Sequence, residues 1–307
     1  MSSPSTSYGR TTDANLEHVV KYAVIALIAA IILDGLVNMI EGGIYIWLTT
    51  SLHWPARFGG AGAVAIIASL AEMGVGFLLL LPIISGKGIP RKEDIMSGTG
   101  RYALLFYLVI GYFFLAGLAY TILGAYLPGI SLILASVFFA LVYVAWRGMF
   151  AMPPMVTAIF MVIGGVLFSI YGFATLTVSL GMEAGVLGIG AIFVGIYYLL
   201  INMGVKNPGL EKAMYYITLM TGEVGFIVGG IGGFVRIANG AMWSGIYIAV
   251  SVFTLFYGIA ALIGGLIAFL YTVKQAISEI SSGGPAPAPA TAPAPPTTPP
   301  PPPPPGS

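Results

Sequence analysis

Two carboxylates and an amide interrupt a long apolar segment near the N-terminus. The stretch ILDGLVNMIEGGIY, residues 32–45, contains Asp34, Asn38 and Glu41 and ends at Tyr45. At roughly 100° per residue of an α-helix, these four side chains fall within an arc of about 60° and form one polar stripe. Carboxyl groups on such a stripe can load and release a proton or bind Na⁺ or K⁺, with the amide and the phenol as neutral ligands.

Two other apolar segments carry a carboxyl group near their centres. Glu72 lies in SLAEMGVGF, with Ser69 on the same helix face, and Glu223 lies in LMTGEVGFIVGGIGGF. An ionisable group at the centre of a bilayer costs about 2.5–3.5 kcal/mol on insertion scales, so it usually faces a bundle interior or a wet cavity. We therefore expect Asp34, Glu72 and Glu223 to lie at similar depth and to meet inside a bundle.

The other charges of the apolar segments are expected nearer the segment ends. Glu183 begins one segment and is expected at its outer boundary, and Arg236 lies near the outer end of the segment that contains Glu223. No Lys or Arg is then expected beside the three central carboxyl groups. They must be protonated, hydrogen-bonded, or facing a cation or water. A purely structural role is the alternative, because a protonated Glu can hydrogen bond across a helix interface.

The composition is that of a membrane protein. The 307 residues are 58% hydrophobic and 7% charged, with a mean hydropathy of +0.97, whereas soluble domains average about 25% charged residues. A net charge of +1 gives no basis for binding nucleic acid. The chain has no Cys and two His, and it contains no nucleotide-binding, zinc-protease or serine-hydrolase motif. The sequence therefore predicts no cofactor, no metal site and no enzyme activity.

Hydropathy predicts an all-α integral membrane protein with eight transmembrane helices, since about 20 apolar residues cross the hydrocarbon core. A polar segment, 1–18, precedes this transmembrane domain, 19–274. The Pro/Ala-rich tail, 275–307, is expected to be disordered. The predicted spans are 19–48, 60–84, 102–125, 128–146, 152–177, 182–203, 213–236 and 242–272.

The basic residues predict the orientation, because cytoplasmic loops are enriched in Lys and Arg. With both termini in the cytoplasm, two of the 12 basic residues, Arg57 and Arg236, lie outside. The other ten lie inside: Arg10, Lys21, Lys87, Arg91, Lys92, Arg101, Arg147, Lys206, Lys212 and Lys274. All four tryptophans fall at predicted span ends, Trp47, Trp54 and Trp243 outside and Trp146 inside. We expect a multi-pass protein of the cell membrane.

Glycines on the seventh span form a stripe away from Glu223. Small residues at such spacing let two helix backbones approach closely, so these glycines are predicted to pack against a neighbouring helix. The alternative is a flexible or broken helix beside a site. No clean internal repeat follows from the spacing of the motifs. The glycines of the stripe are Gly222, Gly225, Gly229 and Gly233.

Three interpretations of function remain. The first is a transporter or channel for a small cation or a proton-coupled solute, which uses the midplane carboxylates. The second is a cofactor-free hydrophobic subunit of a larger respiratory or energy-converting membrane complex. The third, a membrane-embedded enzyme, lacks the metal- or phosphate-binding cluster that such enzymes need. The lipid bilayer is the one partner that the sequence requires; a homo-oligomer and partners in a membrane complex both stay open.

Overall fold

The computed structural model describes residues 7–89, 100–175, 180–205, 207–238 and 248–281, and all regular structure in these residues is α-helical. Eight of the helices are long and apolar enough to cross a membrane, which confirms the eight spans predicted from hydropathy. The tail, 275–307, lies mostly outside the described residues. The helices are α1 (Ser7–Ser51), α2 (Ala56–Ile84), α4 (Arg101–Leu123), α5 (Tyr126–Trp146), α6 (Pro154–Ala174), α7 (Leu180–Asn202), α8 (Pro208–Ala238) and α9 (Ile248–Ser281).

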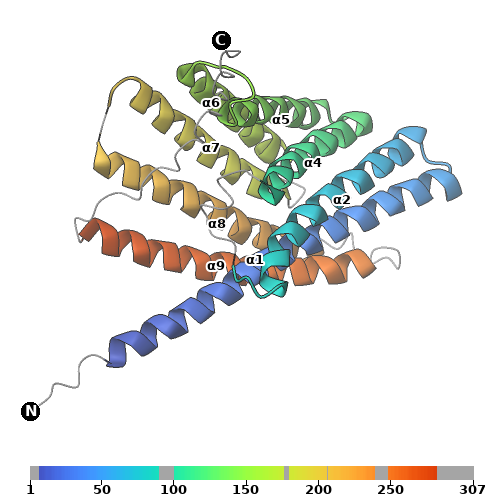
Figure 1. Cartoon of the computed structure of the whole chain (residues 1–307). Coiled ribbons are helices and arrows are strands. Elements are labelled where there is room, and N and C mark those ends of the chain that lie inside the picture. The colour runs from blue at the N-terminus through green and yellow to red at the C-terminus, as the bar shows by residue number, and fades with distance from the viewer. Residues whose placement is uncertain (1–6, 90–99, 176–179, 206, 239–247, 282–307) are drawn as a thin grey trace, which may run out of the picture.

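The observed helix ends differ from the predicted span ends where polar residues continue a helix beyond its apolar part. Helix α1 begins at Ser7, inside the polar N-terminal segment, and α8 begins at Pro208, five residues before the predicted span at 213. Pro208 suits a first helical turn, where its missing N–H would have no partner in any case. Figure 1 shows the α1–α2 connection at one end of the bundle and the α7–α8 connection at the opposite end. Which end faces the cytoplasm stays a prediction.

The helices form a closed ring. Each helix packs against the helix before it and the helix after it in the chain, and α9 packs against α1. Such a ring has an inner face, where side chains of non-adjacent helices meet, and an outer face toward lipid. Many large apolar side chains are exposed on the described helices, including Ile67, Leu70, Phe77 and Leu266, about half of whose surface is open. In lipid this exposure carries no cost, because hydrocarbon tails are as apolar as leucine.

The same close glycine contact occurs in all four pairs of consecutive helices α1–α2, α4–α5, α6–α7 and α8–α9. In each pair, a Cβ added to either glycine would lie 3.2 Å or less from the carbonyl oxygen of the other. Only glycine lets two backbones approach this closely. The described helices therefore form four helical hairpins, each with one reciprocal glycine contact between its two helices. The four pairs are Gly42–Gly62, Gly117–Gly129, Gly165–Gly188 and Gly230–Gly258.

The aromatic residues at the helix ends fit this membrane arrangement. Trp47, in the last turns of α1, and Trp54, in the α1–α2 connection, each expose 42% of their surface. Trp146 ends α5, at the opposite end of the bundle, and Trp243 lies outside the described residues. Indole rings favour the level of the lipid headgroups, because they have an apolar body and one polar N–H.

Adjacent glycines in α1 provide a test of the hairpin contact. A Cβ on Gly42 would lie 2.7 Å from the carbonyl oxygen of Gly62, whereas a Cβ on Gly43 meets no described atom within 4 Å. We expect Gly42→Ala to lower the midpoint of thermal unfolding in detergent, because overpacking costs about 1–3 kcal/mol. Gly43→Ala should be neutral or stabilising, because Ala favours a helix by up to about 1 kcal/mol over Gly. Equal midpoints for the two variants would contradict the contact.

Candidate functional site: a polar cavity inside the helix ring

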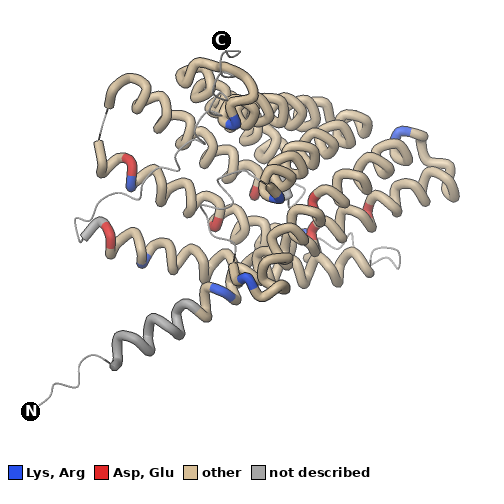
Figure 2. The backbone as a smooth tube through the Cα atoms, viewed as in Figure 1, with Lys and Arg blue, Asp and Glu red and all other residues tan. Residues whose placement is uncertain are grey.

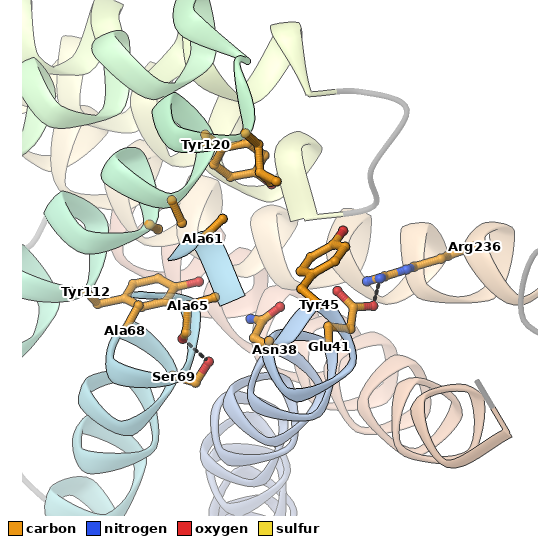
Figure 3. Close-up of a pocket in the computed structure, with 14 residues that line it drawn as sticks. Asn38, Glu41, Tyr45, Ala61, Ala65, Ala68, Ser69, Tyr112, Tyr120 and Arg236 are labelled. Carbon is orange, nitrogen blue, oxygen red and sulfur yellow. Dashed lines mark hydrogen bonds and ion pairs between the residues drawn. The ribbon is translucent and has the colours of Figure 1, made fainter. Parts of the chain in front are cut away.

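A cavity of about 370 Å³ lies between α1, α2, α4 and α8 (Figure 3). Helices α1 and α8 are not neighbours in the ring, so a cavity that both of them line lies on its inner face. Small side chains on one face of α2 and of α4 leave the space open, and polar side chains from four helices project into it. The lining residues are Asn38, Glu41, Gly42, Tyr45, Ala61, Ala65, Ala68, Ser69, Tyr112, Ala116, Ala119, Tyr120, Leu123 and Arg236.

Asp34 and Glu72 form a close carboxyl pair beside the cavity. Both side chains are buried, and their carboxyl groups lie together across the α1–α2 interface. Two carboxyl groups this close in surroundings of low dielectric can share one proton in a hydrogen bond between them. The amide of Asn38, which lines the cavity, donates to both, at 3.4 Å to Asp34 Oδ2 and 3.3 Å to Glu72 Oε2. The carboxyl pair is therefore connected to the cavity through one side chain.

Gly35 explains why these two carboxyl groups can meet. A Cβ at this position would lie 2.7 Å from Met73 Cγ and 3.1 Å from the carbonyl oxygen of Ser69. The absence of a side chain thus lets α1 and α2 approach directly beside Asp34. Because Asp and Glu side chains are short, a wider separation of α1 and α2 would place the two carboxyl groups out of contact.

A third carboxyl group, that of Glu183, also faces the inner side of the ring. It lies in the first turn of α7, as the sequence indicates, but Tyr257 of α9 donates a hydrogen bond of 2.9 Å to its Oε2. Glu183 interacts electrostatically with both Asp34 and Glu72. A Cβ on Gly229 of α8 would lie 2.6 Å from Glu183 Oε2, so a glycine makes the room for this carboxyl group. Glu183 therefore begins its helix, as predicted, and its carboxyl group faces the interior of the ring.

An ion pair forms one wall of the cavity. Arg236 of α8 pairs with Glu41 of α1, and the two side chains expose 22% and 19% of their surface. Their dashed contact is drawn in Figure 3. The sequence places both residues near the outer ends of their spans, yet it does not show that these helix faces converge. The sequence predicts Glu41 as an ion-binding residue, and in the structure the guanidinium group of Arg236 provides its positive charge.

Glu223 is separate from the carboxyl pair. Thr272 of α9 donates a hydrogen bond of 2.5 Å to Glu223 Oε1, while Oε2 is buried without a hydrogen-bond partner among the described residues. No interaction joins Glu223 to Asp34 or Glu72 in the described part of the chain. Similar depth along the membrane therefore does not bring the three predicted carboxyl groups together; Glu183 takes the place expected for Glu223. Figure 2 shows acidic residues both in the middle of the bundle and at helix ends.

The four glycines of the predicted stripe on α8 differ in how closely other residues approach them. Gly222 has open space around it among the described residues, and Gly225 and Gly233 have ordinary contacts of 3.4 Å or more. Gly229 faces Glu183 and Tyr257. The close backbone contact of this helix is instead made by Gly230, the glycine immediately beside the stripe.

Two tyrosines of α4 complete the cavity, and sequence reasoning missed both. Tyr112 and Tyr120 line it together with the predicted Tyr45 and Ser69, whose hydroxyl donates 2.7 Å to the carbonyl oxygen of Ala65. Tyr112 also interacts electrostatically with the carboxyl pair. The lining positions 112, 116, 119 and 120 follow the i, i+4, i+7, i+8 spacing of one helix face. This spacing could have identified the lining face of α4.

The comparisons with known proteins give no assignment. No protein-family model, no curated protein and no solved structure matches the chain. Within the described residues no group of three or more His, Asp or Glu side chains has the arrangement of a metal site. Any functional assignment therefore rests on the geometry of the cavity and of the carboxyl groups beside it.

The ion pair of the cavity wall can be tested by a double-mutant cycle. Arg236→Gln and Glu41→Gln should each lower the free energy of unfolding by about 1–3 kcal/mol, because each change leaves a partly buried charge without its partner. The double variant should lose less than the sum of the single changes. Thermal unfolding in detergent measures all three, with Arg57→Gln at the hairpin tip as a control. Strictly additive losses would show that the pair does not act as a unit.

Proposed function

We propose that this polytopic membrane protein is a proton-coupled transporter of a small solute, in which Asp34 and Glu72 carry the proton and the polar cavity holds the solute. The observation that supports this most strongly is the close carboxyl pair, both members of which accept from Asn38 at the cavity. Ionisable groups inside a membrane domain are rare and mark ion and proton pathways in many transporters and pumps.

The pair has two protonation states with different interactions. With one shared proton, Asp34 and Glu72 stabilise each other through their hydrogen bond. Without it, two carboxylates repel each other at short distance in surroundings of low dielectric. A solute that interacts with Asn38 alters the donor that both carboxyl groups share, so binding in the cavity and protonation of the pair affect each other. That mutual dependence is what coupling requires.

The cavity favours a transporter over the alternative of a cofactor-free subunit of a larger complex. Its volume of about 370 Å³ is at the lower end of the range for small-molecule sites, about 300–1,000 Å³. A proton path alone needs no space of this size. Affinity purification from the native membrane tests the alternative. If the protein is a subunit of a larger complex, redox or ATP-hydrolysing proteins should be purified with it in stoichiometric amounts. Such a result would contradict an independent transporter.

Proteoliposomes test the proposal directly. A panel of small amines, amino acids and carboxylates is added outside vesicles that contain a pH-sensitive dye, and the internal pH is followed. At least one solute should drive proton movement with the wild-type protein. Asp34→Asn and Glu72→Gln should each reduce this movement at least tenfold, because the pair can then no longer exchange its proton. Glu211→Gln, in the first turn of α8, is the matched control and should keep it.

Retained coupling in both carboxyl variants would show that the pair is structural. Equal unfolding midpoints for wild-type and variant proteins ensure that lost coupling is not lost folding.

A further inference from the structure

The size and lining of the cavity indicate an organic solute and not a bare metal ion. Five alanines and one leucine form much of its wall, and its volume of about 370 Å³ falls in the range of about 300–1,000 Å³ for small organic ligands. Three of these alanines, Ala61, Ala65 and Ala68, lie at i, i+4 and i+7 on one face of α2. The solute therefore has an apolar body that fills the space along this face.

Aromatic rings surround the same space. Tyr45 comes from α1, and Tyr112 and Tyr120 come from α4. Figure 3 shows their rings on three sides of the cavity. Tyrosine rings attract an ammonium group through the negative charge density of their faces, and this attraction is largest where water is excluded.

The charges around the cavity also favour a cation. Among the described side chains there, Arg236 and Glu41 neutralise each other as an ion pair. The carboxyl pair retains one negative charge when its two members share a single proton, and Glu183 interacts electrostatically with both of them. No further Lys or Arg of the described residues lines the cavity, and Arg236 is the one lining cation that acts on Asp34. An anion would be repelled by the charge of the carboxyl pair, whereas a cation would offset that charge.

Asn38 supplies a hydrogen-bond acceptor at the cavity. Its amide nitrogen donates to Asp34 and Glu72. Figure 3 shows its amide oxygen on the side of Tyr45 and Glu41. An ammonium group has donors and no acceptor, which makes it complementary to this oxygen.

We infer that the cavity binds a small organic cation, a molecule with one protonated amine and an apolar body, with its ammonium group at Asn38 among the three tyrosines. This inference rests on the proposed function in that it takes the cavity as the solute site. It goes further by fixing the class of solute. Exchange of one monovalent cation for the proton of the carboxyl pair keeps the interior charge constant.

Three ligands of matched shape and different charge test the inference. Benzylamine is a cation at neutral pH, benzyl alcohol is neutral and benzoate is an anion. Equilibrium dialysis against the purified full-length protein in detergent measures their binding. We expect benzylamine to bind at least tenfold more tightly than benzyl alcohol, and benzoate to bind most weakly. Tighter binding of benzoate, equal binding of all three, or no binding of benzylamine would each overturn the inference.

Substitutions of Tyr112 separate the aromatic ring from the hydroxyl group. Tyr112→Leu should weaken benzylamine binding about tenfold, because the cation loses one aromatic face. Tyr112→Phe keeps the ring and should bind within about threefold of wild type. The control is Tyr126→Leu, at an exposed position at the start of α5, which should leave binding unchanged. Equal affinities of the Leu and Phe variants at position 112 would contradict a cation–π contact.

The two proposals fail in different measurements. Charge-selective binding without any proton movement in vesicles would support the cation site and refute transport. Proton movement that depends on Asp34 and is driven by anionic or neutral solutes would support transport and refute the cation site.

Discussion

The hydrocarbon interior of a membrane does not solvate charge, and this constraint decides how the helices must be arranged. Each carboxyl group described within the spans finds its partner on another helix. Asp34 of α1 meets Glu72 of α2, Glu183 of α7 accepts from Tyr257 of α9, and Glu223 of α8 accepts from Thr272 of α9. Asp34–Glu72 and Glu223–Thr272 join neighbouring helices, whereas Glu183–Tyr257 and Glu41–Arg236 join helices that are not neighbours in the ring. Contacts of this second kind require the helices to enclose a common interior. The closed ring is the arrangement that does so.

Glycine contacts make this enclosure possible. Lipid gives two apolar helices no hydrophobic reason to associate, so close van der Waals packing has to hold them together. The four reciprocal glycine pairs supply that packing once in every hairpin. The missing side chain has another effect at Gly35 and Gly229, where it makes room beside a carboxyl group. Glycine therefore sets both the distance between helices and the positions at which short polar side chains can meet.

The sequence contains the position of each residue along the membrane axis, but not which helices are neighbours. Hydropathy predicted the eight spans, and the spacing of Asp34, Asn38, Glu41 and Tyr45 identified a helix face that three of these residues present to the cavity. Depth alone grouped Glu223 with Asp34, although the ring separates them. The pairing of Glu41 with Arg236 depends on α1 and α8 facing each other across the interior, which no local pattern encodes.

In the proposed mechanism, Asn38 connects the carboxyl pair, which carries the proton, with the cavity, which binds the solute. Its donor distances of 3.3 and 3.4 Å exceed the usual 2.7–3.2 Å range for N–H···O bonds, which marks them as weak. Weak bonds to two acceptors can be redistributed at little cost when a ligand engages the amide oxygen. Stronger bonds would stabilise the carboxyl pair more firmly but would respond less to the cavity. In the proposed mechanism such weak bonds would suit Asn38, because a coupling residue has to transmit a change between two sites and not merely stabilise one of them.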